Sequence, residues 1–323
     1  MRKLTYTDAL NEAMDEEMRR DDRIFVIGED VDIAGGVYNL TENLLEKYGA
    51  RRVVGTPISE QGFVGLAVGA AMTGLRPIVE IMYIDFIMLA MDQLCNQMAK
   101  LRYMSGGQFT MPVTIRAQAG AGTSEAAQHS QSLEAWFVHT PGFKVVMPGT
   151  VYDAKGLLKS AIRDNNPVLV IENRVLFYEE EDVPEGEWIV PLGKADVARE
   201  GKDITVIATG YTRKKALAAA QKLTDEISVE VIDPRSIVPL DMGTILASVK
   251  KTGRVLVIHE SPTRCGIGAE IVRRIVAEGF DYLNASPKVL GGADLPIPFS
   301  PPLERACLPQ EDTIISAIRE LMR

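Results

Sequence analysis

Thr56-Pro57-Ile58-Ser59-Glu60-Gln61-Gly62-Phe63 puts one carboxylate at the start of a segment that is otherwise almost wholly apolar. The sequence then continues F-V-G-L-A-V-G-A-A-M-T-G, which predicts a buried helix that begins near Glu60. Burial in apolar surroundings raises the pKa of a carboxyl group, whereas a helix N-terminus favours its charged form. A carboxylate under both influences can share a proton with a bound base, so Glu60 is a candidate functional residue. The alternative is a first-turn acid beside a Ser59 cap, with a structural role only.

Length and composition limit the class of protein. The 323 residues suggest two domains, and 46% hydrophobic with 24% charged residues is typical of a soluble globular protein. No apolar run approaches the ~20 residues that span a bilayer, and the N-terminal segment has no apolar signal core, so we expect neither membrane association nor secretion. The net charge of -9 argues against nucleic acid as a partner. Three cysteines without CxxC spacing fit a reducing compartment, so we expect a cytoplasmic protein.

The order of apolar segments predicts an α/β fold. Short runs rich in Val and Ile alternate with amphipathic segments of helix length, which indicates mostly parallel sheets covered on both faces. The acidic stretch from Tyr178 to Pro191 is interpreted as a linker, so we expect domains at 1–185 and 193–323. Strands are expected at Ile24–Ile27, Val53–Val54, Ile78–Met82, Val113–Arg116, Lys144–Met147, Val168–Glu172, Ile204–Ala208, Val229–Ile232 and Val255–His259. Helices are expected at 85–103, 150–163, 214–226, 242–250, 267–278 and 312–322.

Several catalytic and nucleotide-binding motifs are absent. Gly266-Ile267-Gly268 lacks the third glycine of a dinucleotide fingerprint, and neither GKS or GKT nor GxSxG occurs. Of the three histidines, His129 lies in a long loop of small and polar residues, where binding residues tend to collect. A structural role is favoured for His139 and His259, and no pair of histidines has the spacing of a metal site.

Motifs along nearly the whole chain, in order, resemble the β subunit of thiamine diphosphate-dependent 2-oxo acid dehydrogenases. The segments that carry this resemblance are Ile27-Gly28-Glu29-Asp30-Val31, Thr56-Pro57-Ile58-Ser59-Glu60, Gly74-Leu75-Arg76-Pro77, Arg102-Tyr103-Met104-Ser105-Gly106-Gly107, Ala127-Gln128-His129-Ser130-Gln131, Tyr152-Asp153-Ala154-Lys155-Gly156-Leu157-Leu158, Asp233-Pro234-Arg235-Ser236 and Pro296-Ile297-Pro298-Phe299.

The resemblance implies a pyrimidine-binding domain followed by a transketolase C-terminal-like domain. In the family, the carboxylate that matches Glu60 hydrogen-bonds the aminopyrimidine ring of the cofactor and promotes its activation. Phe86 matches the aromatic residue that packs on the pyrimidine, and Glu29 matches a second acidic residue near the cofactor. His129 matches a histidine at the reacting end, suited to move protons as the acyl group passes to lipoamide.

The resemblance also implies partners and ions. The chain lacks the Gly-Asp-Gly segment and paired asparagines with which the family holds magnesium and the diphosphate. An α subunit is therefore implied, which holds the magnesium and shares thiamine diphosphate in an α2β2 heterotetramer. A dihydrolipoamide acyltransferase core, bound through its subunit-binding domain, and its lipoyl domain are further implied partners. Relatives hold a structural potassium ion, and the matching positions are Val113, Ala161, Ile162, Asp164 and Asn166.

The implied reaction is the decarboxylation of pyruvate or the cleavage of acetoin, with transfer of the acyl group to lipoamide. Branched-chain relatives commonly show adjacent histidines where this chain has Gln128-His129, which disfavours a branched substrate. A branched-chain dehydrogenase subunit is still an alternative. Two others are a mainly non-catalytic docking subunit and a split transketolase-type enzyme.

Overall fold

The computed structural model describes residues 1–323, and the chain divides into two compact units. The first comprises residues 1–119 and 136–192, and the second comprises residues 120–135 and 193–323. The predicted linker ends at Pro191, next to the division between residues 192 and 193. The sequence did not indicate that the segment 120–135 packs with the second unit. No helix in the chain combines the length and the apolar character needed to cross a membrane.

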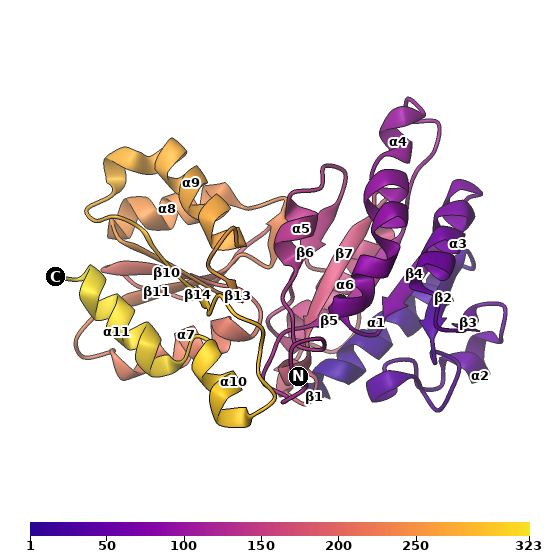
Figure 1. Ribbon diagram of the computed structural model, residues 1–323, viewed down its shortest axis with the longest axis horizontal. Helices are drawn as coiled ribbons and strands as arrows, with labels where there is room; N and C mark the ends of the chain where they lie inside the picture. The colour runs from indigo at the N-terminus through magenta and orange to yellow at the C-terminus, as the bar shows by residue number, and fades with distance from the viewer. The chain divides into compact units, whose positions relative to one another are not determined.

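A parallel sheet forms the centre of the first unit (Figure 1). Its strands follow the order β6-β7-β5-β4-β2-β3, and every neighbouring pair is parallel. The six strands, each beginning within two residues of its predicted start, are β2 (Ile24–Glu29), β3 (Val53–Thr56), β4 (Arg76–Ile81), β5 (Thr114–Ala119), β6 (Lys144–Val146) and β7 (Val168–Asn173). Because the strands run in one direction, their carboxyl ends share one edge, where ligands bind in open α/β sheets.

The α-helices of this part of the chain are α1 (Tyr6–Arg20), α2 (Leu44–Tyr48), α3 (Glu60–Met72), α4 (Leu101–Met104), α5 (Glu134–Val138) and α6 (Val151–Arg163). Two of these helices, α3 and α6, begin directly after caps that the sequence indicates, Ser59 and Thr150. Helix α6 follows Thr150, whose hydroxyl accepts a hydrogen bond from the N–H of Asp153 at 3.0 Å. Short η1 (Val37–Asn39) and η4 (Arg174–Leu176) are single 3₁₀ turns.

The helix predicted at 85–103 is not a single α-helix. It consists of the 3₁₀ segment η2 (Ile84–Ala90), the π segment η3 (Asp92–Met98) and α4. Within η2, Ile84, Ile87 and Ala90 are fully buried. Their spacing of three residues is the period of a 3₁₀ helix, which aligns these side chains on one face.

The stretch interpreted as a linker contains a strand, which the sequence did not indicate. Strand β8 (Glu180–Val183) pairs antiparallel with β1 (Arg2–Thr5). Lys3 Nζ donates to Glu180 Oε1 at 2.7 Å across this pair. Both strands are short and mostly polar, so they lack the apolar signal by which the other strands were found.

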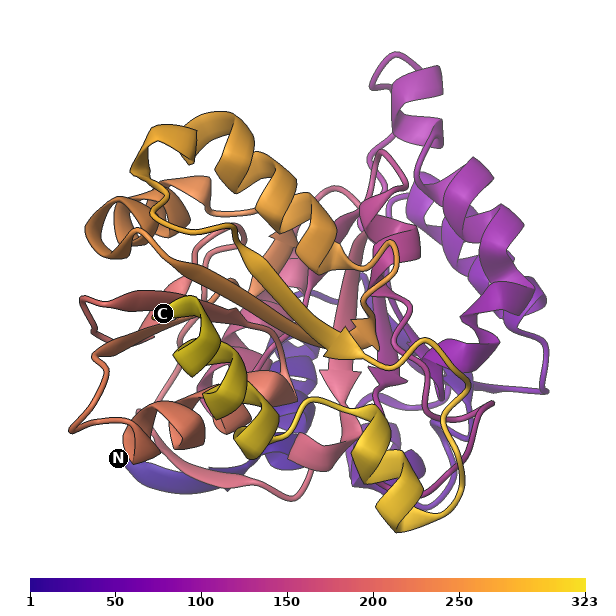
Figure 2. The same ribbon diagram turned by 60° about the vertical axis from the view of Figure 1, so that its left-hand side comes forward.

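The second unit contains a five-stranded sheet between two helical layers. Its order is β14-β13-β10-β11-β9, with only β9 antiparallel to its neighbour. Figures 1 and 2 show α7 and α11 on one face of this sheet and α8 and α9 on the other. The strands of this sheet are β9 (Asp196–Arg199), β10 (Ile204–Ala208), β11 (Val229–Asp233), β13 (Val255–Pro262) and β14 (Lys288–Gly292). The short strand β12 (Ser236–Val238) is not part of it. The helices are α7 (Tyr211–Lys222), α8 (Met242–Thr252), α9 (Ile267–Gly279), η5 (Phe280–Tyr282), α10 (Pro301–Cys307) and α11 (Glu311–Leu321).

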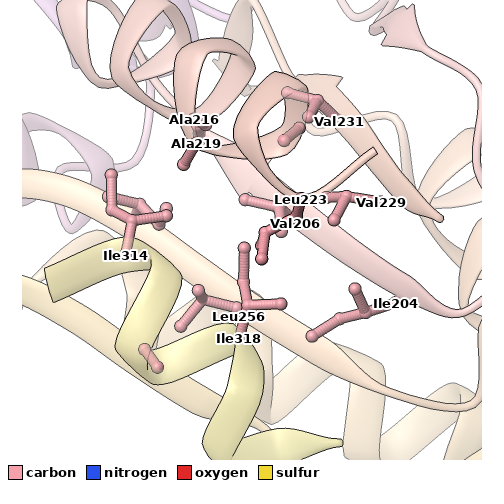
Figure 3. Packing of buried hydrophobic residues seen from close by; sticks show 14 of the residues in the cluster. Ile204, Val206, Ala216, Ala219, Leu223, Val229, Val231, Leu256, Ile314 and Ile318 are labelled. Carbon is pink, nitrogen blue, oxygen red and sulfur yellow. The ribbon is translucent and has the colours of Figure 1, made fainter. Parts of the chain in front are cut away.

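The core beneath α7 and α11 shows why these segments pack together. Val206 and Leu256 of the sheet lie among Ala216 and Ala219 of α7 and Ile318 of α11 (Figure 3). All five side chains are fully buried. The small alanines let α7 approach the sheet closely, while the long apolar side chains fill the remaining space.

Candidate active site

Two carboxyl groups lie where strands of the first unit end. Glu29 is the last residue of β2 and is paired in register with Thr56, the last residue of β3. Four residues further on, Glu60 is the first residue of α3. Glu60 is only 5% exposed, so the expected buried position of this acid is confirmed.

The electrostatic environment of Glu29 shows that these two groups interact. Burial raises the pKa of Glu29, and the charges of Glu60 and then Asp30 raise it further. A hydrogen bond from the backbone N–H of Ser59 acts in the opposite direction. Two carboxyl groups that share one poorly solvated place do not ionise as readily as two separate ones. The raised pKa of Glu29 therefore reflects first its burial and then the nearby negative charge of Glu60.

Buried polar atoms without partners lie at the same edge. Glu29 Oε1 and Thr56 Oγ1 are buried and have no hydrogen-bond partner within the chain. In native proteins such atoms are rare, and each requires an explanation such as a bound polar ligand. Glu29 and Thr56 therefore fit the polar groups of an incoming cofactor ring.

Sequence reasoning missed Gln118, near the carboxyl end of β5. Its side chain is 1% exposed, and both its amide oxygen and its amide nitrogen lack a partner. The available signal was a lone amide within the buried strand Thr114–Ala119, where a polar side chain without a partner costs free energy.

Phe86 lies in η2, directly after β4. Its ring is half-buried and contacts Tyr83 edge to face, with ring centroids 5.9 Å apart. The guanidinium of Arg174 lies over the other aromatic ring, 4.9 Å from the Tyr83 centroid. Phe86 therefore sits on a supported aromatic surface after a strand end, which suits the packing of a flat ring.

His129 belongs to the second unit, in the segment 120–135. The residue is half-buried, and its backbone N–H donates to Ala126 O at 3.3 Å. The neighbouring Ser130 Oγ is buried without a partner. The structure thus brings Glu29, Glu60 and Phe86 together in one unit and places His129 in the other.

His259 is fully buried in a polar network of the second unit. Ser261 Oγ donates to Glu134 Oε1 at 2.6 Å, so its one proton is committed. His259 Nδ1 lies 2.9 Å from Ser261 Oγ and 3.0 Å from Ser261 O, and must be the donor to both. Burial lowers the pKa of His259, and the charge of Glu134 opposes this. The geometry is that of a neutral structural histidine. His139, by contrast, is exposed.

The residues expected to bind potassium do not fit that ion as they are placed. Arg76 Nη2 donates to Ile162 O at 2.7 Å and to Asp164 O at 2.6 Å. The carboxylate of Asp164 accepts from Lys144 Nζ and from the N–H of Asn166. The remaining carbonyl oxygens accept backbone hydrogen bonds, Val113 O from Val168 and Ala161 O from Asp164. The positive charge that an ion would bring is already present in Arg76 and Lys144.

The chain has no group of three or more His, Cys, Asp or Glu side chains that could hold a metal ion. This count does not test the expected magnesium, which the resemblance assigns to a partner.

Comparison with known proteins identifies both units. Residues 2–179 match the family model "Transketolase, pyrimidine binding domain", and residues 193–314 match "Transketolase, C-terminal domain". A solved structure described as "Split gene transketolase, inactive beta4 tetramer" superposes with a TM-score of 0.79 at 22% identity, covering 99% of this chain and 98% of that one. At this identity, the match shows the fold alone. The fold and site therefore define a two-domain protein of the transketolase class, and the predicted fold class is confirmed.

Full-length relatives narrow this class. The chain is 47% identical to "Pyruvate dehydrogenase E1 component subunit beta" of Rhizobium meliloti (strain 1021), over 99% of this chain and 70% of that protein. It is 45% identical to "Acetoin:2,6-dichlorophenolindophenol oxidoreductase subunit beta" of Bacillus subtilis (strain 168), over 99% and 98%. The chain belongs to the family of thiamine diphosphate-dependent pyruvate and acetoin dehydrogenase β subunits.

Proposed function

We propose that this chain, with an α subunit, forms a dehydrogenase component that acts on pyruvate or acetoin and passes the acyl group to lipoamide. The observation that carries the proposal is the buried Glu60 at the start of α3, beside a Glu29 whose pKa is raised and whose Oε1 has no partner. Thiamine diphosphate, when bound, supplies a nucleophilic carbon and accepts the electrons released as a bond next to a carbonyl group breaks.

Each residue of the chain has a defined task in this proposal. Glu60 shares a proton in a hydrogen bond to a ring nitrogen of the pyrimidine. Glu29 lies close enough to Glu60 to interact with it electrostatically. Phe86 packs against the pyrimidine and excludes water from it. His129 moves protons at the reacting end, since an imidazole can act both as a general acid and as a general base.

A docking subunit without catalytic work would have no use for these groups. A carboxylate in an apolar wall costs free energy unless a partner offsets it. Glu60 at 5% exposure and the unpartnered atoms of Glu29 and Thr56 therefore favour catalysis over the docking alternative.

The α subunit and the acyltransferase core complete the proposal. The names of the relatives describe one subunit of a larger component, and this chain lacks the magnesium motif, so the partner supplies magnesium and holds the diphosphate. We place the docking of the acyltransferase subunit-binding domain on residues 193–323. The net charge of -9 suits a basic module, for which association slows as salt rises.

Substrate choice is tested by reconstituting the chain with its α subunit and thiamine diphosphate. Dye reduction is then compared for pyruvate, acetoin and 3-methyl-2-oxobutanoate. We expect kcat/KM for pyruvate or acetoin to exceed that for the branched acid by about 10-fold or more, since a hydrophobic pocket discriminates by about this factor per methylene. A preference for the branched acid would refute the use made of Gln128-His129.

A further inference from the structure

The segment Gly120–Ala135, called the 120–135 segment below, carries His129 and contains backbone dihedral angles that residues with side chains seldom adopt. Gly120 and Gly122 have φ of +89° and +115°, and the non-glycine residues Ser124 and Ala126 have φ of +59° and +63°. Residues with side chains seldom adopt this left-handed region and do so where surrounding contacts hold them. The conformation must therefore be maintained from outside the segment.

The side chain of Glu304 supplies that support. Glu304 lies in α10 and is 3% exposed. Its Oε1 accepts from Gly122 N at 2.7 Å and from Ser124 N at 3.2 Å. Its Oε2 accepts from Ser124 N at 3.1 Å and from Ser124 Oγ at 3.3 Å. All side-chain hydrogen bonds of this buried carboxylate thus go to the 120–135 segment, 180 residues earlier in the chain.

A second carboxylate holds the other end of the segment. Glu134 accepts a hydrogen bond from Ser261 Oγ at 2.6 Å, within β13. In addition, the N–H of Gly120 donates to Gln131 O at 3.0 Å, which joins the two ends of the loop that contains His129. His129 therefore lies between two points at which the loop is fixed to the core of the second unit.

We infer that Glu304 is a positioning residue that holds the 120–135 segment in the conformation in which it presents His129. This inference rests on the proposed role of His129. Glu304 itself acts on the backbone of Gly122 and Ser124. A charge-assisted bond to backbone N–H groups is stronger than a neutral one, and here it restricts a backbone that would otherwise sample other conformations.

Glu304→Gln tests the inference, because the amide keeps the size of the side chain but removes its charge and one of the two acceptor oxygens that hold Gly122 and Ser124. In the full-length chain we expect amide hydrogen exchange of these two residues to become about 10- to 100-fold faster, with protection of β10 and β13 unchanged. Glu226→Gln is the matched control, since that carboxylate is 53% exposed and pairs with Arg319 at the surface of the same unit. Ser124→Ala, which removes only the hydroxyl contact, serves if the first variant does not fold.

The assembled enzyme shows whether the effect passes through His129. Glu304→Gln should lower kcat of the lipoamide-linked reaction more than it raises KM, and should add little further loss to His129→Ala. Unchanged exchange in the 120–135 segment, or losses that simply multiply in the double variant, would overturn the inference. Activity of His129→Ala alone decides the proposed role of His129, whereas hydrogen exchange in Glu304→Gln decides whether Glu304 holds the segment, so the two can fail separately.

Discussion

Glu29 and Glu60 show how single residues set the chemistry of this chain. Glu60 is the first residue of α3, which follows β3, and Glu29 is the last residue of β2, which pairs with β3. Sequence reasoning found Glu60 because a lone acid before a run of small apolar residues is conspicuous. It could not find the raised pKa of Glu29, because that depends first on burial of the side chain and then on the charge of Glu60, 31 positions later.

Glu29→Gln is expected to make the protein more stable and less active. The pKa of Glu29 is higher in the folded than in the unfolded state, so its contribution to the unfolding free energy falls as pH rises through the folded value. Glutamine removes this fall, and we expect a melting temperature about 1–3 °C above that of the parent at pH 7–8, with no difference near pH 4. Thermal denaturation across this pH range is the measurement. Parallel curves for variant and parent would show that Glu29 ionises normally.

His129→Ala is expected to impair acyl transfer to lipoamide more than dye reduction. His129 lies in the 120–135 segment of the second unit, apart from Glu60 of the first unit. General acid–base groups typically contribute about 10²–10⁴-fold to a rate. We expect about a 10²-fold loss in the lipoamide-linked rate and a smaller loss with the dye. His139→Ala, at an exposed position, is the control. Equal losses in both assays would assign His129 to an earlier step.

At the level of elements, the strands were predictable and the irregular segments were not. β10 was predicted to the residue because Ile204–Ala208, with the sequence I-T-V-I-A, is rich in β-branched residues and follows the polar pair Lys202-Asp203. The 3₁₀ and π segments η2 and η3 were predicted as one α-helix, since short apolar runs fit several helical periods. The sequence could not show that Arg76 reaches Ile162 O and Asp164 O, two of the positions expected to bind potassium.

A buried ion cluster joins the central strands of the first unit. Arg116 of β5 donates from Nη1 to Glu80 Oε2 at 2.7 Å, and from Nε to Glu172 Oε1 at 2.7 Å. All three residues are at most 3% exposed. Burial raises the pKa of Glu80 and Glu172, and the charge of Arg116 opposes this.

Arg116→Met should destabilise the chain by about 3–5 kcal/mol at pH 7, because it leaves two buried carboxylates without a counter-charge. The loss should shrink toward pH 5, where the two acids, with pKa values raised in the folded state, can take up protons. Urea denaturation at both pH values tests this. Arg273→Met breaks an exposed pair with Glu270 and should leave the free energy of unfolding nearly unchanged. A loss of similar size for both variants contradicts the account.

At the scale of the whole molecule, the two units contribute different candidate residues. Glu29, Glu60 and Phe86 belong to the first unit, whereas His129 belongs to the second because the 120–135 segment packs there. The sequence predicts one division near residue 190. It could not reveal this excursion, because contacts such as Gly122 with Glu304 join positions 182 residues apart.

The isolated chain is expected not to bind thiamine diphosphate with magnesium. It carries the residues proposed to bind the pyrimidine but neither a cluster of three acidic, histidine or cysteine ligands nor the magnesium motif. Calorimetric titration of the full chain should show no saturable heat, and the same titration after addition of the α subunit should show binding. Micromolar affinity of the chain alone would mean that it holds the whole site.

Proton exchange at the thiazolium carbon of bound thiamine diphosphate tests most directly whether this chain activates the cofactor. The assembled enzyme is diluted into D2O, quenched after millisecond intervals and analysed by NMR, with the parent compared with Glu60→Gln. Since Glu60 is buried beside Glu29 at the start of α3, we expect the variant to fold and to bind the cofactor but to exchange roughly 10²–10⁴-fold more slowly. An exchange rate equal to that of the parent, at equal cofactor occupancy, would remove Glu60 from the reaction and contradict the proposed function.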